Sequence, residues 1–145
     1  MKVVRIRSAI AMVCLAAGMS VVSMASARAE NGILERWYTA LFDVDREALS
    51  ELLADEALIQ LEDLGITQTK AEYIASLDEW EEVAQNTNFA WQIDAEAPQD
   101  ADQATALVCY QFPDNDLMMR EVFSFGDGRI TGSVQSAVGD TCEEF

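Results

Sequence analysis

Histidine is absent from the 145-residue sequence. This absence removes the commonest general base, the usual Ser-His-Asp and Cys-His catalytic arrangements and most zinc sites. No glycine-rich phosphate loop follows a predicted strand, and no acidic cluster has the spacing of a Ca²⁺ loop with a distal bidentate glutamate. The sequence therefore predicts no metal site and no cofactor.

Positive charge is also scarce, because nine Lys and Arg residues stand against 26 Asp and Glu residues. Four of the nine, Lys2, Arg5, Arg7 and Arg28, precede the first acid, so residues 30–145 carry a net charge of 5 − 26 = −21. Each phosphate contact to nucleic acid or anionic lipid needs a Lys or Arg. The composition argues against nucleic acid as a partner and is typical of a solvated, salt-tolerant surface.

The first 29 residues have the pattern of an export signal. Basic residues precede an apolar run over residues 9–22, and small residues dominate positions 25–29. Cleavage after Ala27 and cleavage after Ala29 fit equally well. A retained membrane anchor is the competing interpretation, but polar and glycine positions interrupt the run. We predict a signal peptide over 1–29, one domain over 30–145, no membrane contact after processing, and a periplasmic or extracellular location.

Of the three cysteines, Cys14 lies in the predicted signal, which leaves Cys109 and Cys142. In an exported protein such a pair favours a disulfide over two free thiols. Predicted strands over 104–112 and 129–138 would run parallel in a meander, with both cysteines toward the same end of the sheet. The sequence therefore predicts a Cys109–Cys142 disulfide.

Three short amphipathic helices are predicted in the first half of the domain. The first begins near Asn31, and the second is capped by Asp45 and ends around Asp55. Thr69 and Glu72 form a capping box that starts the third. Helical spacing predicts these apolar stripes, in chain order: Leu34, Trp37, Tyr38 and Leu41; Leu49, Leu52 and Leu53; Tyr73, Leu77, Trp80 and Ala84.

Strand-like alternation follows the helices, apart from one strand that lies between the second and the third. The predicted strands cover residues 57–62, 88–95, 104–112, 117–125 and 129–138. Gly126-Asp127-Gly128 is a hairpin signal. Helices followed by a meander predict an α+β domain with three N-terminal helices packed on one face of a curved antiparallel sheet, a cone-shaped α+β barrel that leaves a cavity between the layers.

The same order of elements resembles the nuclear transport factor 2-like superfamily, which includes ketosteroid isomerases and SnoaL-like polyketide cyclases. The resemblance is carried by residues 36–41, 45, 49, 52–57, 65, 70–77 and 121–130. It covers nearly the whole of the predicted domain. The superfamily hosts enzymes, binding modules and proteins with no assigned role, so the resemblance implies a fold and leaves the activity open.

The isomerases of this superfamily combine a tyrosine donor on the first helix, a carboxylate base at the end of the first strand and a protonated acid on a later strand. The resemblance places Trp37, Leu61 and Glu121 at these three positions. A shift of one residue turns a strand side chain to the opposite face, so the base is missing unless the first strand carries a bulge. The remaining catalytic candidates are neighbours in the chain: Tyr38, Glu62 and Asp63.

A candidate ligand pocket follows from the predicted inner faces of the helices and strands. It comprises Trp37, Tyr38, Leu61, Trp80, Trp91, Glu121 and Phe123. Aromatic residues at these spacings are also typical of an ordinary core. Glu121 shares its strand face with apolar residues and is either a pocket acid or a core acid satisfied by Tyr38 or Trp37.

The leading hypothesis is an exported protein that binds an apolar small molecule, or acts as an accessory to a partner, without catalysis. One alternative is an isomerase-like or SnoaL-like enzyme that moves a proton next to a carbonyl, with Glu121 as acid or base and Tyr38 as donor. Another is a structural homodimer that uses its sheet as the interface. Leu61 at the position of the base favours the first and third hypotheses over the second.

Overall fold

The computed structural model describes residues 22–98, 100–143 and 145, and their side chains from residue 30 onward. Most of the predicted export signal lies outside the described residues. Within them, no helix combines the length and the apolar character needed to cross a membrane.

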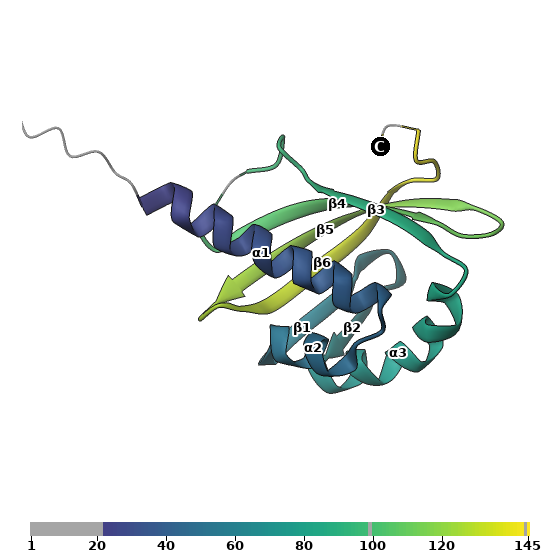
Figure 1. The fold of residues 1–145 in the computed structure, drawn as a ribbon, viewed down its shortest axis with the longest axis horizontal. Helices are drawn as coiled ribbons and strands as arrows, with labels where there is room; N and C mark the ends of the chain where they lie inside the picture. Colours follow the sequence, from purple (N-terminus) through teal and green to yellow (C-terminus); the bar gives the residue numbers. More distant parts are fainter. Residues whose placement is uncertain (1–21, 99, 144) are drawn as a thin grey trace, which may run out of the picture.

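Three helices pack against one curved, six-stranded sheet (Figure 1). The elements are α1 (Val22–Phe42), α2 (Arg46–Leu52), β1 (Leu53–Leu61), the 3-10 turn η1 (Glu62–Leu64), β2 (Ile66–Thr69), α3 (Lys70–Ala84), β3 (Asn88–Ile93), β4 (Gln103–Gln111), β5 (Asp116–Gly126) and β6 (Arg129–Gly139). The predicted α+β class and the helix-on-sheet arrangement are confirmed.

The sheet is mixed rather than purely antiparallel as predicted. Its strand order is β2-β1-β6-β5-β4-β3, and β1 runs parallel to β6 while every other neighbouring pair is antiparallel. The parallel pair arises because the chain leaves β1 through β2, α3 and a meander before β6 returns beside β1. With β2 and β3 as free edges, the sheet stays open and does not close into a barrel.

Several boundaries differ from the prediction. The helix α1 begins at Val22 instead of near Asn31, because the alanine-rich segment that suits a signal peptidase is also a good helix former. The helix α2 ends at Leu52 instead of around Asp55, since Leu53 is already extended and opens β1. The strand β2 was not predicted, because its four residues are largely exposed and lack a periodic apolar signal.

The predicted turn and cap signals are confirmed. Asp45 accepts a hydrogen bond from the Ala48 amide (3.0 Å), and Thr69 forms the capping box of α3. Gly65 follows η1 with φ +62°, and the hairpin between β5 and β6 turns through Asp127 and Gly128 with φ values of 51° and 74°. These positive values suit a two-residue turn that matches the twist of the strands.

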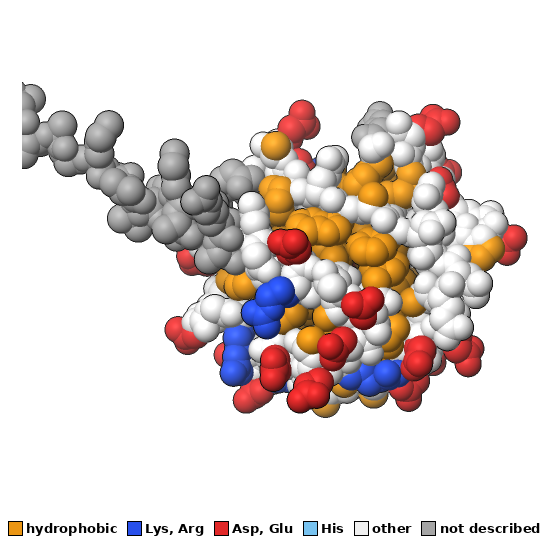
Figure 2. Space-filling model, viewed as in Figure 1, with side chains coloured by type: hydrophobic (Ala, Val, Ile, Leu, Met, Phe, Trp, Pro, Cys, Tyr) orange, Lys and Arg blue, Asp and Glu red, His pale blue; other side chains and the backbone are white. Residues whose placement is uncertain are grey.

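The core lies between the helices and the inner face of the sheet. Its largest fully buried side chains include those of Trp37, Tyr38, Leu34, Leu49, Phe123 and Ile130. The predicted disulfide joins Cys109 on β4 to Cys142 beyond β6, with 5.8 Å between the Cα atoms. Figure 2 shows hydrophobic side chains across the middle of one face, with acidic side chains around its margin and over its lower half.

Candidate functional site

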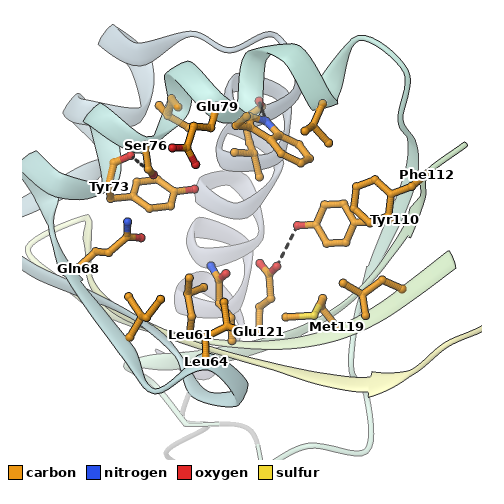
Figure 3. A pocket seen from close by; sticks show the side chains of 17 residues that line it. Leu61, Leu64, Gln68, Tyr73, Ser76, Glu79, Tyr110, Phe112, Met119 and Glu121 are labelled. Atoms are coloured by element: carbon orange, nitrogen blue, oxygen red, sulfur yellow. Dashed lines mark hydrogen bonds between the residues drawn. The ribbon is translucent and has the colours of Figure 1, made fainter. Parts of the chain in front are cut away.

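A cavity of about 510 Å³ lies between α3 and the inner face of the sheet (Figure 3). Most of its lining side chains are apolar. They are Leu41, Leu61, Leu64, Ile66, Gln68, Tyr73, Ser76, Leu77, Glu79, Trp80, Val83, Tyr110, Phe112, Leu117, Met119, Glu121 and Gln135. Leu64, Ile66 and Val83 are among the exposed large hydrophobic residues, so the lining continues to the surface. A volume of this size suits a small organic molecule.

The helix α3 forms one wall because its cap fixes where the helix begins. From the capping box, Tyr73, Leu77 and Trp80 fall on one helical face and turn toward the sheet. The Trp80 indole donates from Nε1 to the carbonyl oxygen of Leu41 (2.8 Å), which ties the wall to the end of α1. The capping box and the Trp80 hydrogen bond thus fix the position of α3 at the cavity.

Glu121 on β5 supplies the buried carboxyl of the cavity and is 1% exposed. Its Oε2 accepts a hydrogen bond from the Tyr38 hydroxyl (2.8 Å), and its Oε1 accepts one from the Tyr110 hydroxyl (3.0 Å). In the sheet, Ala106 and Gln135 are its neighbours on the two adjacent strands. The carboxyl therefore accepts one hydrogen bond from a tyrosine of α1 and one from a tyrosine of β4.

Burial controls the electrostatics of this carboxyl. Desolvation raises the pKa of Glu121 to about 6, against the lowering effect of the hydrogen bonds from Tyr38 and Tyr110. At pH 7 the ionised form therefore prevails. Burial, and the charge of Glu121 beside them, raise the pKa of the Tyr38 and Tyr110 hydroxyls well above their ordinary value, so both stay neutral donors.

Tyr73 and Trp37 add two further polar groups near the cavity. The Tyr73 side chain points its hydroxyl into the space above Glu121 (Figure 3). The Trp37 ring stacks on that of Tyr73 with 5.5 Å between centroids and meets Phe123 edge-on at 5.8 Å. The Trp37 indole nitrogen is buried and has no hydrogen-bond partner among the described residues. Trp37 therefore supports the wall and contributes no hydrogen bond to it.

Comparisons with known proteins settle the fold. No family model matches the sequence, and no curated protein matches it. Solved structures do match, including a candidate ketosteroid isomerase from Kribbella flavida DSM 17836 (15% identity, 77% of this chain and 79% of that chain, TM-score 0.63). A second is an NTF-2 like protein of unknown function from Burkholderia xenovorans LB400 (13% identity, 77% and 84%, TM-score 0.64). This chain has the nuclear transport factor 2-like fold.

The nuclear transport factor 2-like fold does not fix the chemistry. An LEH-like epoxide hydrolase from M. tuberculosis also matches (16% identity, 80% of this chain and 84% of that chain, TM-score 0.55). At such identities the likeness extends to the backbone only, so activity must be argued from the side chains of this chain.

Three of the seven predicted pocket residues line the cavity between α3 and the sheet, namely Leu61, Trp80 and Glu121. The other four pack around it and do not line it: Trp37, Tyr38, Trp91 and Phe123. Tyr38 nevertheless acts on the site through its hydrogen bond to Glu121. The Trp91 ring packs against that of Tyr38 with 4.8 Å between centroids.

The two shifted base candidates do not reach the cavity. Glu62 and Asp63 lie in the exposed turn η1, and the Asp63 carboxylate accepts a hydrogen bond from the Ala137 amide of β6. The register shift of β1 falls between Leu53 and Leu58, well before this turn, so it does not re-aim either side chain. Leu61 takes the cavity-facing position and has no group that can accept a proton.

Sequence reasoning missed Tyr110, the second donor to Glu121. Tyr110 pairs with Leu117, four residues along β5 from Glu121, so strand register alone does not bring the two together. It also missed Tyr73, Gln135 and Met119 as lining residues. The alternation of β4 and the stripe of α3 could have placed Tyr110 and Tyr73 on inner faces, but the cavity itself depends on the curvature of the sheet.

Proposed function

We propose that this protein binds a small, largely apolar molecule in the cavity beneath α3 and does not catalyse a reaction on it. The observation that carries the proposal is the cavity of about 510 Å³ that has an apolar lining and a single buried carboxyl, Glu121. Apolar walls supply the free energy of binding, and one placed polar group orients the ligand.

The residue at the aligned position of the base argues against the isomerase-like alternative, because Leu61 cannot accept a proton. Proton abstraction next to a carbonyl needs a base within hydrogen-bond reach of the carbon. Among the described cavity residues the carboxylates are Glu121, which already accepts from two tyrosines, and Glu79, which is exposed. Leu61 stands where the base would be. The arrangement suits binding better than proton transfer.

Export remains part of the proposal. The sequence pattern of residues 1–29 carries it, and the Cys109–Cys142 disulfide is consistent with an oxidising compartment. We therefore infer that the ligand is met in the periplasm or outside the cell.

Filling the cavity is expected to weaken binding of an uncharged apolar probe. Ser76 lines the cavity on α3, so Ser76→Trp places an indole inside it and should weaken binding of Nile red by roughly tenfold or more. Ala75 is exposed and does not line the cavity, so Ala75→Trp is the matched control and should bind as the wild type does. Fluorescence titration of folded variants measures both. Absence of binding to the wild type, or equal binding by Ser76→Trp, contradicts the proposal.

A homodimer formed through the sheet is a second candidate, favoured by the low charge of the strands. Away from their ends, β4, β5 and β6 carry only two charged side chains, Arg120 and Glu121. Glu121 faces the cavity, and Arg120 pairs with Asp94 (3.2 Å). The exposed large hydrophobic residues of β1 and β6 are Leu58, Val134 and Val138. In so acidic a protein, a stretch of sheet with little charge on β4, β5 and β6 lets two copies approach.

Sedimentation equilibrium tests this second candidate. Val134→Glu should convert a dimer to a monomer, whereas Ala75→Glu, which adds the same charge at an exposed position of α3 away from this face of the sheet, should leave it intact. A monomeric wild type rules the homodimer out.

A further inference from the structure

We propose that the ligand is an organic cation, a molecule with an apolar body and one ammonium group that pairs with Glu121. This inference rests on the proposed binding function and adds the chemical class of the ligand. It is carried by three features of the described residues: a buried carboxylate without a cation, aromatic walls around it, and an acidic exterior.

Within the described part of the chain, the Glu121 carboxylate has no positively charged partner. No Lys or Arg is among the described residues that line the cavity. The cations of residues 30–145 are Arg36, Arg46, Lys70, Arg120 and Arg129. Three of these five are engaged elsewhere, in ion pairs with Asp55, Asp78, Glu81 and Asp94. A buried charge without an ion partner is costly, and a cation that enters the cavity compensates it.

The hydrogen bonds of Glu121 leave room for such a group. Each carboxylate oxygen can accept about two hydrogen bonds, and each already accepts one, from Tyr38 or Tyr110. Figure 3 shows the carboxyl group directed from the sheet into the cavity. An ammonium supplies several N–H donors and a full positive charge at this position, whereas a carboxylate ligand would place a second negative charge beside the first.

Aromatic side chains surround the same space. Tyr73, Trp80, Tyr110 and Phe112 all line the cavity, and the rings of Trp80 and Tyr110 meet edge-to-face with 6.0 Å between centroids. The faces of aromatic rings carry negative potential and attract ammonium groups. The walls that bind the apolar body of the ligand therefore also favour its charge.

The acidic surface of the protein also favours a positively charged ligand. Glu79 lines the cavity and is exposed, and the whole chain carries a formal charge of −17. Such a field raises the local concentration of cations and lowers that of anions. The protein thus attracts a positively charged ligand before any contact is made.

The charge of Glu121 also makes cation binding depend on pH. The titratable groups that line the cavity or contact this carboxyl are Tyr38 of α1, Tyr73 and Glu79 of α3, and Tyr110 of β4. The three tyrosines have raised pKa values and stay neutral, and Glu79 is exposed. Below a pH of about 6 Glu121 takes up a proton, so affinity for a cation should fall there while affinity for a neutral ligand should not.

Three probes of one shape test the inference on the full chain: phenylbutylammonium, phenylbutanol and phenylbutyrate. By calorimetry above neutral pH, the ammonium should bind roughly tenfold or more tightly than the alcohol, and the carboxylate should bind most weakly. Glu121→Gln should remove the preference, so that the variant binds the ammonium no more tightly than it binds the alcohol. Glu47→Gln changes the net charge equally at an exposed site of α2 that does not line the cavity, and should leave the preference intact.

The outcomes separate this inference from the proposed function. If the alcohol binds as tightly as the ammonium, or if Glu121→Gln keeps the preference for the ammonium, the cation inference is wrong and the binding function stands. If none of the probes binds, both are wrong. Loss of the preference in folded wild-type protein as the pH falls through about 6 supports the inference without any substitution.

Discussion

Cys142→Ala is expected to lower the free energy of unfolding by about 4 kcal/mol. The disulfide to Cys109 spans a sequence separation of 33, and closing a loop of that length removes conformational entropy from the unfolded chain. Cys142 lies beyond β6 and is only partly buried, so its loss leaves no cavity in the core, unlike the loss of the buried Cys109. Urea denaturation of the oxidised wild type and of the variant measures the difference.

Two controls separate the disulfide from other effects of the substitution. Reduced wild type should be as unstable as Cys142→Ala, and reductant should leave the variant unchanged. Thr141→Ala alters the same tail without touching the disulfide and should stay close to the wild type. Equal stability of oxidised and reduced wild type would show that the disulfide does not stabilise the fold.

Glu121→Gln should gain about 2 kcal/mol of stability relative to the wild type as the pH rises from about 4 to about 8. Desolvation raises the pKa of Glu121 in the folded protein to about 6, above the ordinary value of 4.5. Between these values the folded state holds more protons than the unfolded state. The stabilising contribution is therefore fully present below about pH 4.5 and is lost as the pH rises through about 6.

The difference between variant and wild type isolates this group from the other acids. Urea denaturation at the two ends of the pH range gives the two free energies of unfolding. The matched control is Glu47→Gln, which removes an exposed carboxyl of α2. A flat difference for Glu121→Gln would mean that Glu121 ionises as easily in the folded protein as in the unfolded one.

The fold could be predicted where local physics decides it. The Asp45 cap, the Thr69 capping box and the hairpin turn at Asp127 and Gly128 depend on a few neighbouring residues, and each is found where expected. The parallel pairing of β1 with β6 joins segments distant in sequence, so no local pattern could predict it. The strand β2 pairs with the neighbouring β1, but its largely exposed residues carry no periodic apolar signal.

Some features of the site could likewise be predicted from local sequence patterns, and others could not. Glu121 could be placed on an inner face from strand alternation, and Leu61 could be recognised as a residue that cannot act as a base. The hydrogen bond from Tyr110 could not be foreseen, because it joins residues that are not opposite one another in the strand register. The aromatic residues Trp37, Tyr38 and Phe123 fill the core behind the cavity wall, since hydrophobic spacing alone does not distinguish a core from a pocket.

An NMR titration of the Glu121 side-chain carboxyl tests the central claim most directly, namely that this acid is buried, uncompensated and reachable from the cavity. We expect an apparent pKa of about 6 for the free protein and a lower pKa when phenylbutylammonium is present. A carboxyl that titrates near the ordinary value of 4.5 and that does not respond to the ammonium would contradict the account.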